Sequence, residues 1–572
     1  MMQTCHLPWL LLVISTASPA AWLGTCPGAL QQPGIRVLDT LLQAGGSRIT
    51  VVAAENRIPD CNMTEIPVPA DRLRWVRMLN RKEADALSRG IIIKNSRGET
   101  RNGLPQEIIP LQDSSTAPAP APAPASVPIG AELLPQLKGT VFGRENRAVL
   151  RQDGASLRLE CAAGQAAAGA LLASPTDLRL PAGATVALKL DTSAEGVFRI
   201  GAADAAREKI GESLTLGSIQ PGERSSGFAL PAGLDKATWR LWVIECPESA
   251  AQLSIRSARL EAQPAGETPP RSLWVWEPSV WQLNTASTMT LLAAYGADTI
   301  FVTVPLDSAK ENVTDAASLQ RFIAAAAARG VKVWAVIGDP LAVLPTERDQ
   351  FAKMARAYTT YNRDSPVEAR LSGLQLDIEP YLNSGYQLDT EEWLAAYLDT
   401  LARVRTQAMM PLDVAVPSWW GRQRYRNSLF LDHLGSQIDV VSVMNYRTDR
   451  QQLIDLAEPF LEWGVRAKKT IRIGLEAGPI PDESLHVFRA GSNGDLWLLP
   501  LGDNNLLVSL DAAQAHSAAR VFTYSHSITR QGTNTTFHRN IGAMQKLLPQ
   551  LETVWRAWPS FGGIALHGLD AD

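Results

Sequence analysis

The chain has 572 residues, which is too long for one ordinary hydrophobic core, so we expect two or three domains. Apolar residues make up 45% and charged residues 20%, as is typical of globular proteins. The 54 basic and 58 acidic side chains give a formal net charge of -4, and no long basic run occurs. This balance argues against nucleic acid as a partner.

The N-terminus carries an apolar run from Leu7 to Ala17 followed by small residues. This pattern predicts a secretory signal peptide over residues 1–21, although no Lys or Arg precedes the run. A lipid anchor at Cys26 is not expected, because Thr is a poor fit before the Cys of a lipoprotein cleavage site. No later apolar stretch is long enough to predict a transmembrane helix. The expected location is therefore the periplasm or the cell exterior.

The cysteines fit an exported protein. Of the five in the chain, Cys5 would leave with the signal peptide, and an even number remains. Local pairing would join Cys26 to Cys61 and Cys161 to Cys246, although spacing alone does not fix the connectivity. No Cys follows residue 270, which excludes a cysteine nucleophile or a Cys-type zinc site there. The seven His lack metal-ligand spacing, so no metal or cofactor is expected.

The first region of the mature chain, residues 28–113, predicts a small α/β unit. It mixes strand-like and helical pieces, such as Arg48 to Ala54 and Arg72 to Ser88, and indicates no function. Residues 114–128 follow as a Pro/Ala-rich segment, which predicts an extended, semi-rigid linker.

Residues 130–265 change in character to short alternating runs separated by Gly, Pro and Asp. The runs are 156–160, 185–190, 196–200, 238–244 and 253–257. This pattern predicts an all-β sandwich. The sandwich could bind carbohydrate through an exposed Trp239 or Trp242, or it could serve as a spacer.

From residue 272 the pattern switches to strands that alternate with helices. Strands are expected at 273–276, 298–303, 331–337, 373–379, 412–416, 438–444, 470–475 and 561–566. Eight such strands within residues 272–572 predict a (β/α)8 TIM barrel, in which the active site lies at the C-terminal ends of the strands. Residues 480–530 are expected to form a long insertion between the seventh and eighth strands.

The fourth expected strand, 373–379, carries an unusual polar face. Strand side chains alternate between faces, so Gln375, Asp377 and Glu379 share one face, opposite an apolar one. A parallel strand covered on both sides is normally apolar throughout. The inward face of a barrel can hold such a polar row, with its last member at the catalytic end. The alternative is a capping or salt-bridged acid pair in a loop.

Carboxylates and aromatic side chains recur at the expected strand ends. The residues at these strand ends are Trp276, Glu277, Asp339, Asp377, Glu379, Ser418, Trp419, Trp420, Met444, Asn445, Tyr446, Arg447, Glu476 and His567. Aromatic walls bind sugar rings, and paired carboxylates cleave glycosidic bonds. We therefore predict a carbohydrate site. Its substrate contacts are expected from Trp276, Gln375, Trp419, Trp420, Met444 and His567.

The segment Ser372-Gly-Leu-Gln-Leu-Asp-Ile-Glu379 resembles the fourth-strand signature of glycoside hydrolase family 18, the chitinase-like barrels. That signature is Asp-Gly-x-Asp-x-Asp-x-Glu. Its Gly, last Asp and Glu match here, whereas Ser372 and Gln375 depart from it. Met444-Asn-Tyr446 is similar to the family's Met-x-Tyr on strand six. Residues 561–566 resemble its last strand, with His567 where those enzymes often carry Trp.

A second resemblance is to clan A glycosidases, which place the acid/base after strand four and the nucleophile after strand seven. Here Ile378-Glu-Pro380 and Glu476 occupy these places, but Ile378 replaces the usual Asn. Uncharacterised bacterial barrel proteins with an Asp-x-Glu-Pro-Tyr strand are more similar than either family.

The two resemblances imply different mechanisms. In the chitinase-like one, Glu379 protonates the leaving oxygen, Asp377 orients a substrate N-acetyl group that acts as nucleophile, and Tyr446 helps to hold that group. In the two-carboxylate one, Glu379 is acid/base and Glu476 is the nucleophile. Arg472 shares a face with Glu476, so an ion pair between them is the structural alternative for that Glu.

These observations predict an exported glycoside hydrolase that cleaves a polysaccharide, with an amino-sugar exopolysaccharide as one candidate. A non-catalytic polysaccharide-binding protein on a degenerate glycosidase barrel is the alternative, and the departures at Ser372 and Gln375 favour it. A third alternative is a structural component with envelope or export partners.

Overall fold

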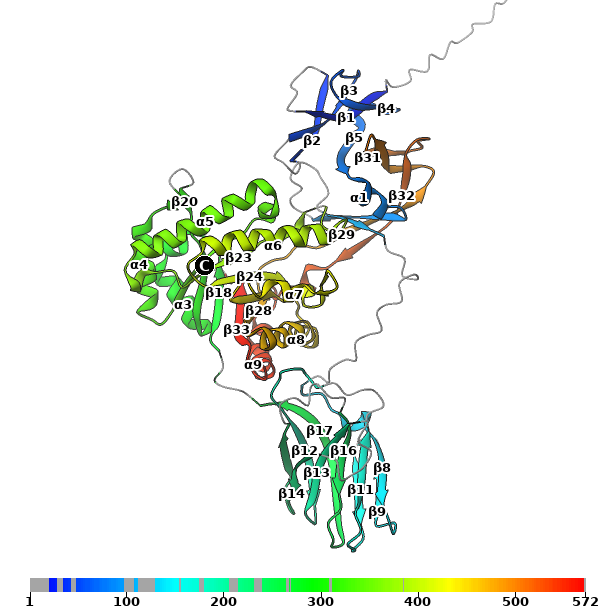
Figure 1. Cartoon of the computed structure of the whole chain (residues 1–572), viewed down its shortest axis with the longest axis vertical. Coiled ribbons are helices and arrows are strands. Elements are labelled where there is room, and N and C mark those ends of the chain that lie inside the picture. The colour runs from blue at the N-terminus through cyan, green and yellow to red at the C-terminus, as the bar shows by residue number, and fades with distance from the viewer. Residues whose placement is uncertain are drawn as a thin grey trace, which may run out of the picture. The chain divides into compact units, whose positions relative to one another are not determined.

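The computed structural model describes residues 20–27, 34–42, 48–96, 107–111, 129–153, 156–173, 180–204, 214–230, 239–263, 267, 269–307, 311–383 and 385–569. The expected linker and nearly all of the expected signal peptide lie outside these residues. The chain divides into two compact units (Figure 1). One comprises residues 1–112, 381–390 and 483–530, and the other comprises the remainder.

The second unit contains a closed barrel of eight parallel strands, as predicted. In order around the barrel they are β18 (Arg271–Val275), β19 (Ala297–Thr303), β22 (Lys332–Ile337), β23 (Gly373–Leu376), β24 (Leu412–Pro417), β27 (Val440–Met444), β28 (Thr470–Glu476) and β33 (Phe561–His567). The barrel closes where Ser272 of β18 pairs with Ala565 of β33. β23 is shorter than expected, but the Asp377 N–H still donates to the Ile337 carbonyl at 2.8 Å.

At least one helix lies between each two consecutive barrel strands along the chain. They are α2 (Ser279–Gln282), α3 (Thr285–Tyr295), α4 (Ala316–Ala327), α5 (Pro345–Asp364), α6 (Thr390–Gln407), α7 (Phe430–Leu434), α8 (Arg450–Ala467) and α9 (Ile541–Trp555). α4 shows why these segments become helical. Leu319, Phe322, Ile323 and Ala326 recur at helical spacing and are buried, and the Asp315 side chain caps the first turn.

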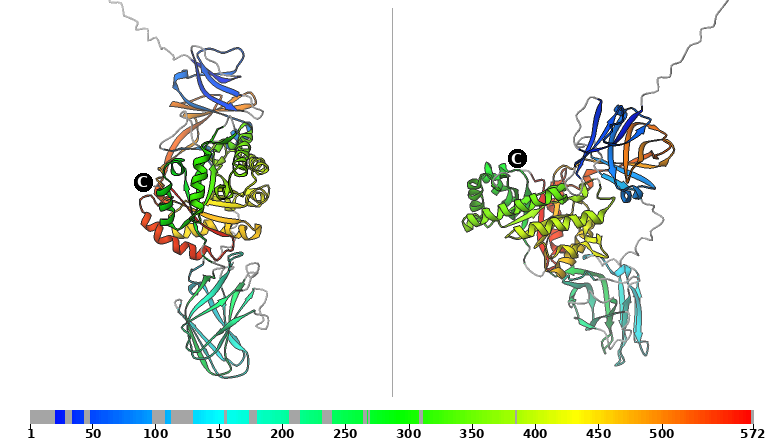
Figure 2. Two further views of the ribbon diagram at one scale, coloured as in Figure 1. Left: turned by 90° about the vertical axis from the view of Figure 1, so that its left-hand side faces the viewer. Right: turned by 45° about the horizontal axis from the view of Figure 1, so that its top comes forward.

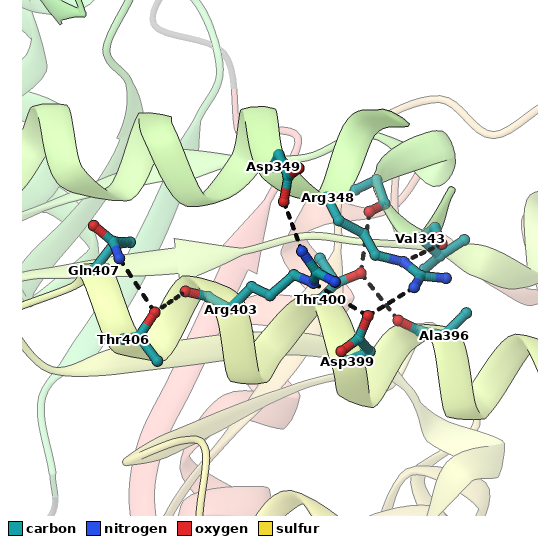
Figure 3. A network of polar contacts seen from close by, with 10 residues as sticks. Val343, Arg348, Asp349, Ala396, Asp399, Thr400, Arg403, Thr406 and Gln407 are labelled. Atoms are coloured by element: carbon teal, nitrogen blue, oxygen red, sulfur yellow. Dashed lines mark hydrogen bonds and ion pairs between the residues drawn. The ribbon is translucent and has the colours of Figure 1, made fainter. Parts of the chain in front are cut away.

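A polar network joins α5 to α6 (Figure 3). The Arg348 guanidinium donates to the Asp399 carboxylate at 2.7 Å and to the Val343 carbonyl at 2.8 Å. From α6, Arg403 donates to the Asp349 carboxylate at 2.7 Å. Because α5 precedes β23 and α6 follows it, this network fixes the two helices that flank the strand leading to Asp377 and Glu379.

The barrel interior is packed with aromatic rings. The Trp274 and Phe301 rings stack with their centroids 5.5 Å apart, and Trp334 meets Phe301 edge-on at 6.0 Å. Gly373 makes room for this packing, since a Cβ there would lie 2.3 Å from the Trp334 ring. Gly373 therefore faces the barrel interior, and by strand alternation Gln375 shares this face.

An ion pair between the first strand and the last helix supports barrel closure. Arg271 of β18 binds Glu552 of α9 through two hydrogen bonds of 2.8 and 3.1 Å, and it also donates to the Tyr295 carbonyl at 3.0 Å. Most of the surface of both side chains is buried. We expect Glu552→Gln to lower the free energy of unfolding of the barrel by about 2 kcal/mol, because a charge-assisted pair is lost. Urea titration would measure this, with Lys546→Gln on the same helix as control. Equal midpoints for the two variants would contradict it.

The same unit contains two five-stranded antiparallel sheets around one apolar core. The first has the order β15 (Ser225–Ala229), β12 (Val186–Ala194), β17 (Ala251–Ala262), β10 (Leu157–Cys161) and β9 (Ala148–Gln152). The second has the order β14 (Leu214–Ile219), β13 (Phe198–Asp204), β16 (Trp239–Glu245), β11 (Ala168–Ala173) and β8 (Lys138–Gly143).

Within these sheets the predicted disulfide between Cys161 and Cys246 is present. Trp242 is 4% exposed and belongs to the core, so its expected role as an exposed sugar-binding residue is wrong. The Trp239 side chain lies outside what the structure describes.

The first unit joins strands from residues 73–110 with strands from residues 483–530 in one sheet, which the sequence did not predict. Its seven-stranded order is β5 (Leu73–Leu79), β31 (Asn504–Gln514), β30 (Gly494–Leu501), β32 (Arg520–Arg530), β29 (Glu483–Gly491), β6 (Gly90–Ser96) and β7 (Glu107–Pro110). Figure 2 shows these N-terminal strands in blue beside the later strands in orange. The expected barrel insertion and the expected N-terminal region are thus parts of one unit.

A four-stranded sheet completes the first unit, in the order β2 (Ile35–Leu42), β3 (Arg48–Ala54), β1 (Ala21–Pro27) and β4 (Asn62–Ile66). The predicted disulfide joins Cys26 of β1 to Cys61. The one helix described between residues 20 and 111 that is longer than a 3-10 turn is α1 (Arg81–Ala86). The region is therefore mainly strand, and the mixed α/β character expected for it is slight.

Candidate active site

Asp377 and Glu379 lie immediately after β23, at the C-terminal end of the barrel strand. Both side chains are half-buried. One carboxyl oxygen of Asp377, Oδ1, is buried and has no hydrogen-bond partner in the described part of the chain. An unsatisfied buried carboxyl oxygen is costly unless a ligand or a proton completes it. The Asp377 carboxyl after β23 can therefore accept a hydrogen bond from a ligand or take up a proton.

Burial raises the pKa of the Asp377 carboxyl well above its ordinary value, and the neighbouring Glu379 charge raises it further. Two carboxylates that share one site cannot both ionise freely. The pair therefore tends to hold one proton between its two members, as general acid chemistry requires.

The raised pKa of Asp377 predicts a pH-dependent stability. The native carboxyl holds its proton more tightly than the unfolded one, so stability falls as pH rises from the ordinary carboxyl pKa through the raised native pKa. Asp377→Asn removes this titration. We expect the variant to be more stable than wild type at the high-pH end and to show a flatter profile, as measured by urea unfolding across pH. A profile parallel to that of wild type would contradict the assignment.

Tyr446 follows β27 and faces the same carboxylates. Burial raises the pKa of its phenol well above the usual value, and the charges of Glu476, Asp377 and Glu379 each add to the shift. All three acids therefore act on one hydroxyl group. The Tyr446 and His567 rings are nearly parallel, at 13° with centroids 6.3 Å apart. The structure thus brings together residues from four strand ends that the sequence predicted to converge.

Glu476, His567 and Trp276 form a hydrogen-bonded chain, which we call the relay. The Glu476 Oε2 atom lies 2.6 Å from His567 Nδ1, and the Trp276 Nε1–H donates to His567 Nε2 at 2.6 Å. The other Glu476 oxygen accepts the Gly478 N–H at 2.6 Å. Glu476 is 3% exposed, so this carboxylate is buried with a partner for each oxygen.

A buried polar network forms the floor beneath the site. Gln375 accepts the Trp274 indole N–H and donates to Asp413 at 3.0 Å and to Ser442 at 3.2 Å. Ser442 donates to the same Asp413 oxygen at 2.8 Å, and Arg472 donates to it at 2.7 Å. Gln375 is fully buried, so it supports the site from below instead of contacting substrate as predicted.

Arg472 pairs with Asp413, so the expected alternative of an Arg472–Glu476 ion pair is wrong. The guanidinium also lies over the rings of Phe301 and Trp334, 5.3 and 5.1 Å from their centroids. Burial raises the pKa of Asp413, although Arg472 opposes this shift. All three donors bind one Asp413 oxygen, and the other, Oδ1, is buried without a hydrogen-bond partner among the described residues. The floor therefore contains an ion pair that is strongly desolvated and only partly hydrogen-bonded.

The two adjacent tryptophans after β24 have opposite environments. Trp419 is 48% exposed, whereas Trp420 is fully buried and packs edge-on against Tyr397 and Phe430. They lie in a 3-10 turn, Ser418–Arg422, which turns successive side chains in different directions. Trp420 is therefore a core residue and not the sugar contact predicted for it. Trp276 is 37% exposed and Met444 is half-buried.

Sequence reasoning missed Tyr397 and Asp413. Burial raises the pKa of the Tyr397 phenol, as do the charges of Asp377 and Asp413, so its hydroxyl group lies near both acids. That hydroxyl is buried and has no hydrogen-bond partner among the described residues. Asp413 could have been singled out from the sequence, because an acid inside the apolar run 412–416 is expected to be buried. Buried acids are rarely without a partner, so such a residue indicates a polar network. Tyr397 lies on a helix and carried no such signal.

Among the described residues, no three His, Cys, Asp or Glu side chains are grouped so as to hold a metal ion. No helix in the described ranges has the length and apolar character that a membrane crossing requires.

Comparisons with known proteins show no family. No protein-family model and no curated protein matches the chain. Among solved structures, the CBM22-1–GH10 modules of Clostridium thermocellum endo-1,4-beta-D-xylanase 10B are 10% identical, cover 61% of this chain and 82% of their own, and give a TM-score of 0.25. A family 29 carbohydrate-binding module is 12% identical over 22% of this chain and 78% of its own, with a TM-score of 0.17. Likenesses this low carry no argument about function.

Proposed function

We propose that the protein is a glycoside hydrolase on a (β/α)8 barrel and that Glu379 is its general acid. The observation that carries the proposal is the Asp377–Glu379 pair at the exit of β23, beside the Tyr446 phenol. A half-buried carboxyl next to a second acid meets the requirement for proton donation to a glycosidic oxygen. Burial and the Glu379 charge both raise the pKa of Asp377, which favours retention of a proton by the pair.

The substrate-assisted mechanism fits this arrangement best. Glu379 would protonate the leaving oxygen while the carbonyl oxygen of a substrate N-acetyl group attacks the anomeric carbon. Asp377 would bind the N–H of that group, which supplies the partner missing from its buried Oδ1 atom. The Tyr446 hydroxyl would donate to the attacking carbonyl. Glu379 would then take a proton from the water that opens the intermediate.

The two-carboxylate mechanism fits less well. A nucleophile needs a free oxygen that can reach the anomeric carbon, whereas both Glu476 oxygens already have partners 2.6 Å away. We therefore assign catalysis to Glu379, Asp377 and Tyr446, and a positioning role to Glu476.

The substrate we propose is an extended polysaccharide outside the cytoplasm. Trp276 and Trp419 expose large aromatic surfaces, which suit the apolar faces of consecutive sugar rings. Two disulfides are typical of proteins from oxidising compartments, which supports export.

The test is reducing-end release by the full chain from neutral, acidic and N-acetylated polysaccharides. We expect cleavage of N-acetylated polymers only. Cleavage of other polymers alone would overturn the substrate-assisted mechanism and restore Glu476 as a nucleophile candidate. Binding without release from any polymer would favour the non-catalytic alternative. Gln375 supports that alternative, since it stands where the family 18 signature has an acid and is tied up with Trp274 and Asp413.

A further inference from the structure

The relay fixes the position of the His567 proton. A Trp indole N–H can only donate, so Nε2 of His567 must accept it at 2.6 Å. The proton of the neutral ring therefore sits on Nδ1, which faces the Glu476 Oε2 atom at 2.6 Å. One tautomer satisfies both contacts and the other satisfies neither. Trp276 thus holds its N–H toward a ring whose orientation is set from the other side by a carboxylate.

The inner end of the relay is rigid. Glu476 is buried, and its second oxygen is held by the Gly478 N–H. The His567 ring is confined on its faces and edges as well, since Tyr446 lies nearly parallel to it and Trp274 meets it at 76° with centroids 6.1 Å apart. A ring that is bonded at both nitrogens and enclosed by two aromatic neighbours has little freedom to turn.

The outer end of the relay is open. Trp276 is 37% exposed, whereas Trp274, two residues earlier, is 5% exposed. The N–H edge of the Trp276 indole is held by His567, and the two rings meet at 83°. An indole held by one edge presents its face in a constant direction, and such preorganisation lowers the ordering cost of binding.

We propose that His567 is a positioning residue that fixes Trp276 as a sugar-contacting wall of the site, with Glu476 as the buried anchor. This inference rests on the proposed function and extends it. It gives Glu476 a role in substrate binding instead of nucleophilic attack. Glu476 would then affect substrate affinity through His567 and Trp276, without touching the substrate.

The test compares full-length His567→Phe and His567→Gln with wild type on the polymer that wild type cleaves. Phe keeps a ring beside Tyr446 but removes both polar contacts, whereas the Gln amide can still accept from Trp276 and donate to Glu476. We expect His567→Phe to raise KM about tenfold, which is about 1.4 kcal/mol of binding, with kcat within about threefold of wild type. His567→Gln should recover most of the affinity.

Trp276→Phe is a second, independent variant, because it keeps a smaller aromatic ring in the wall and removes the N–H donor. It should raise KM like His567→Phe, and the double variant should be no worse than either single one, since both break the same contact. This variant also decides the matter if His567→Phe fails to fold. A wild-type KM in Trp276→Phe, fully additive effects, or a loss confined to kcat would each overturn the proposal.

Failure of the proposed function is distinguishable from failure of the relay. If wild type binds a polymer without cleaving it, the same variants are compared by dissociation constant, with the same tenfold expectation. If wild type cleaves and Glu379→Gln does not, but His567→Phe binds and cleaves like wild type, the relay is overturned and the hydrolase stands. If wild type neither binds nor cleaves any polymer in the panel, both proposals fall.

Discussion

Replacing Glu379 with Gln is expected to lower kcat for polysaccharide hydrolysis by about 10²–10⁴-fold, because an amide cannot give a proton to the leaving oxygen. The side chain is half-buried at the exit of β23, and its charge contributes to the raised pKa of Asp377. The substitution keeps the shape of the side chain, so polymer affinity should stay within a few-fold of wild type. Reducing-end release at saturating substrate measures the effect.

Glu277→Gln is the matched control for this variant. Glu277 is exposed and follows β18, so the same chemical change is made at the same end of the barrel without touching the acid pair. The control should keep wild-type kcat. If the two variants keep the same activity, Glu379 is not the acid and the catalytic proposal fails.

The largest stability effect is expected from Arg472→Met. It would leave the fully buried Asp413 carboxylate without its cation in the barrel floor, a change that typically costs about 3–5 kcal/mol. The contacts of the guanidinium with the Phe301 and Trp334 rings would be lost as well. Urea unfolding of the full chain, followed by far-ultraviolet circular dichroism, would show the barrel transition at lower denaturant.

Two comparisons make this prediction specific. Arg363 pairs with Asp364 on the exposed surface, so Arg363→Met should leave the transition unchanged. The double variant Arg472→Met with Asp413→Asn should recover part of the loss, because no lone charge then remains buried. An Arg472→Met transition equal to that of Arg363→Met would show that the floor pair does not hold the barrel together.

The eight barrel strands could be predicted because each is a short apolar run bounded by polar turns. The structure places all eight within a few residues of the expected positions. Strict alternation also predicted that Gln375 would point inward. Alternation predicts which face of the strand a side chain lies on, but it does not predict how far that side chain lies from the catalytic end of the barrel. Gln375 was expected to meet substrate and instead is fully buried, because it lies one inward-facing position, or two residues, before Asp377 along the chain.

The environment of each aromatic residue was harder to predict. Trp419 and Trp420 are neighbours of the same type, yet one is exposed and the other is fully buried. The difference comes from the 3-10 turn after β24, whose geometry is not encoded in hydrophobic period. Trp242 was misjudged for a related reason, since a residue in an alternating strand can face either a shared core or solvent.

The partner of a strand is the least predictable property. The segment 72–88 was expected to be helical, but its first part forms strand β5. Nothing local in the sequence indicates that β5 pairs with β31. The two disulfides could be predicted because their cysteines are only 35 and 85 residues apart, much closer in sequence than β5 and β31. Pairings across most of the chain depend on tertiary packing, which a one-dimensional pattern does not contain.

The shared sheet has a consequence for the order in which the chain acquires structure. β5 and β6 are separated in the seven-stranded sheet by β31, β30, β32 and β29, whose residues are synthesised more than 380 positions later. A ribosome-bound chain that ends at residue 480 therefore contains the first seven barrel helices, α2 to α8, in full but only β5, β6 and β7 of this sheet. β6 can pair with β29 only after residue 491 has been made, and β5 with β31 only after residue 514, so the part of the protein made first is among the last to be completed.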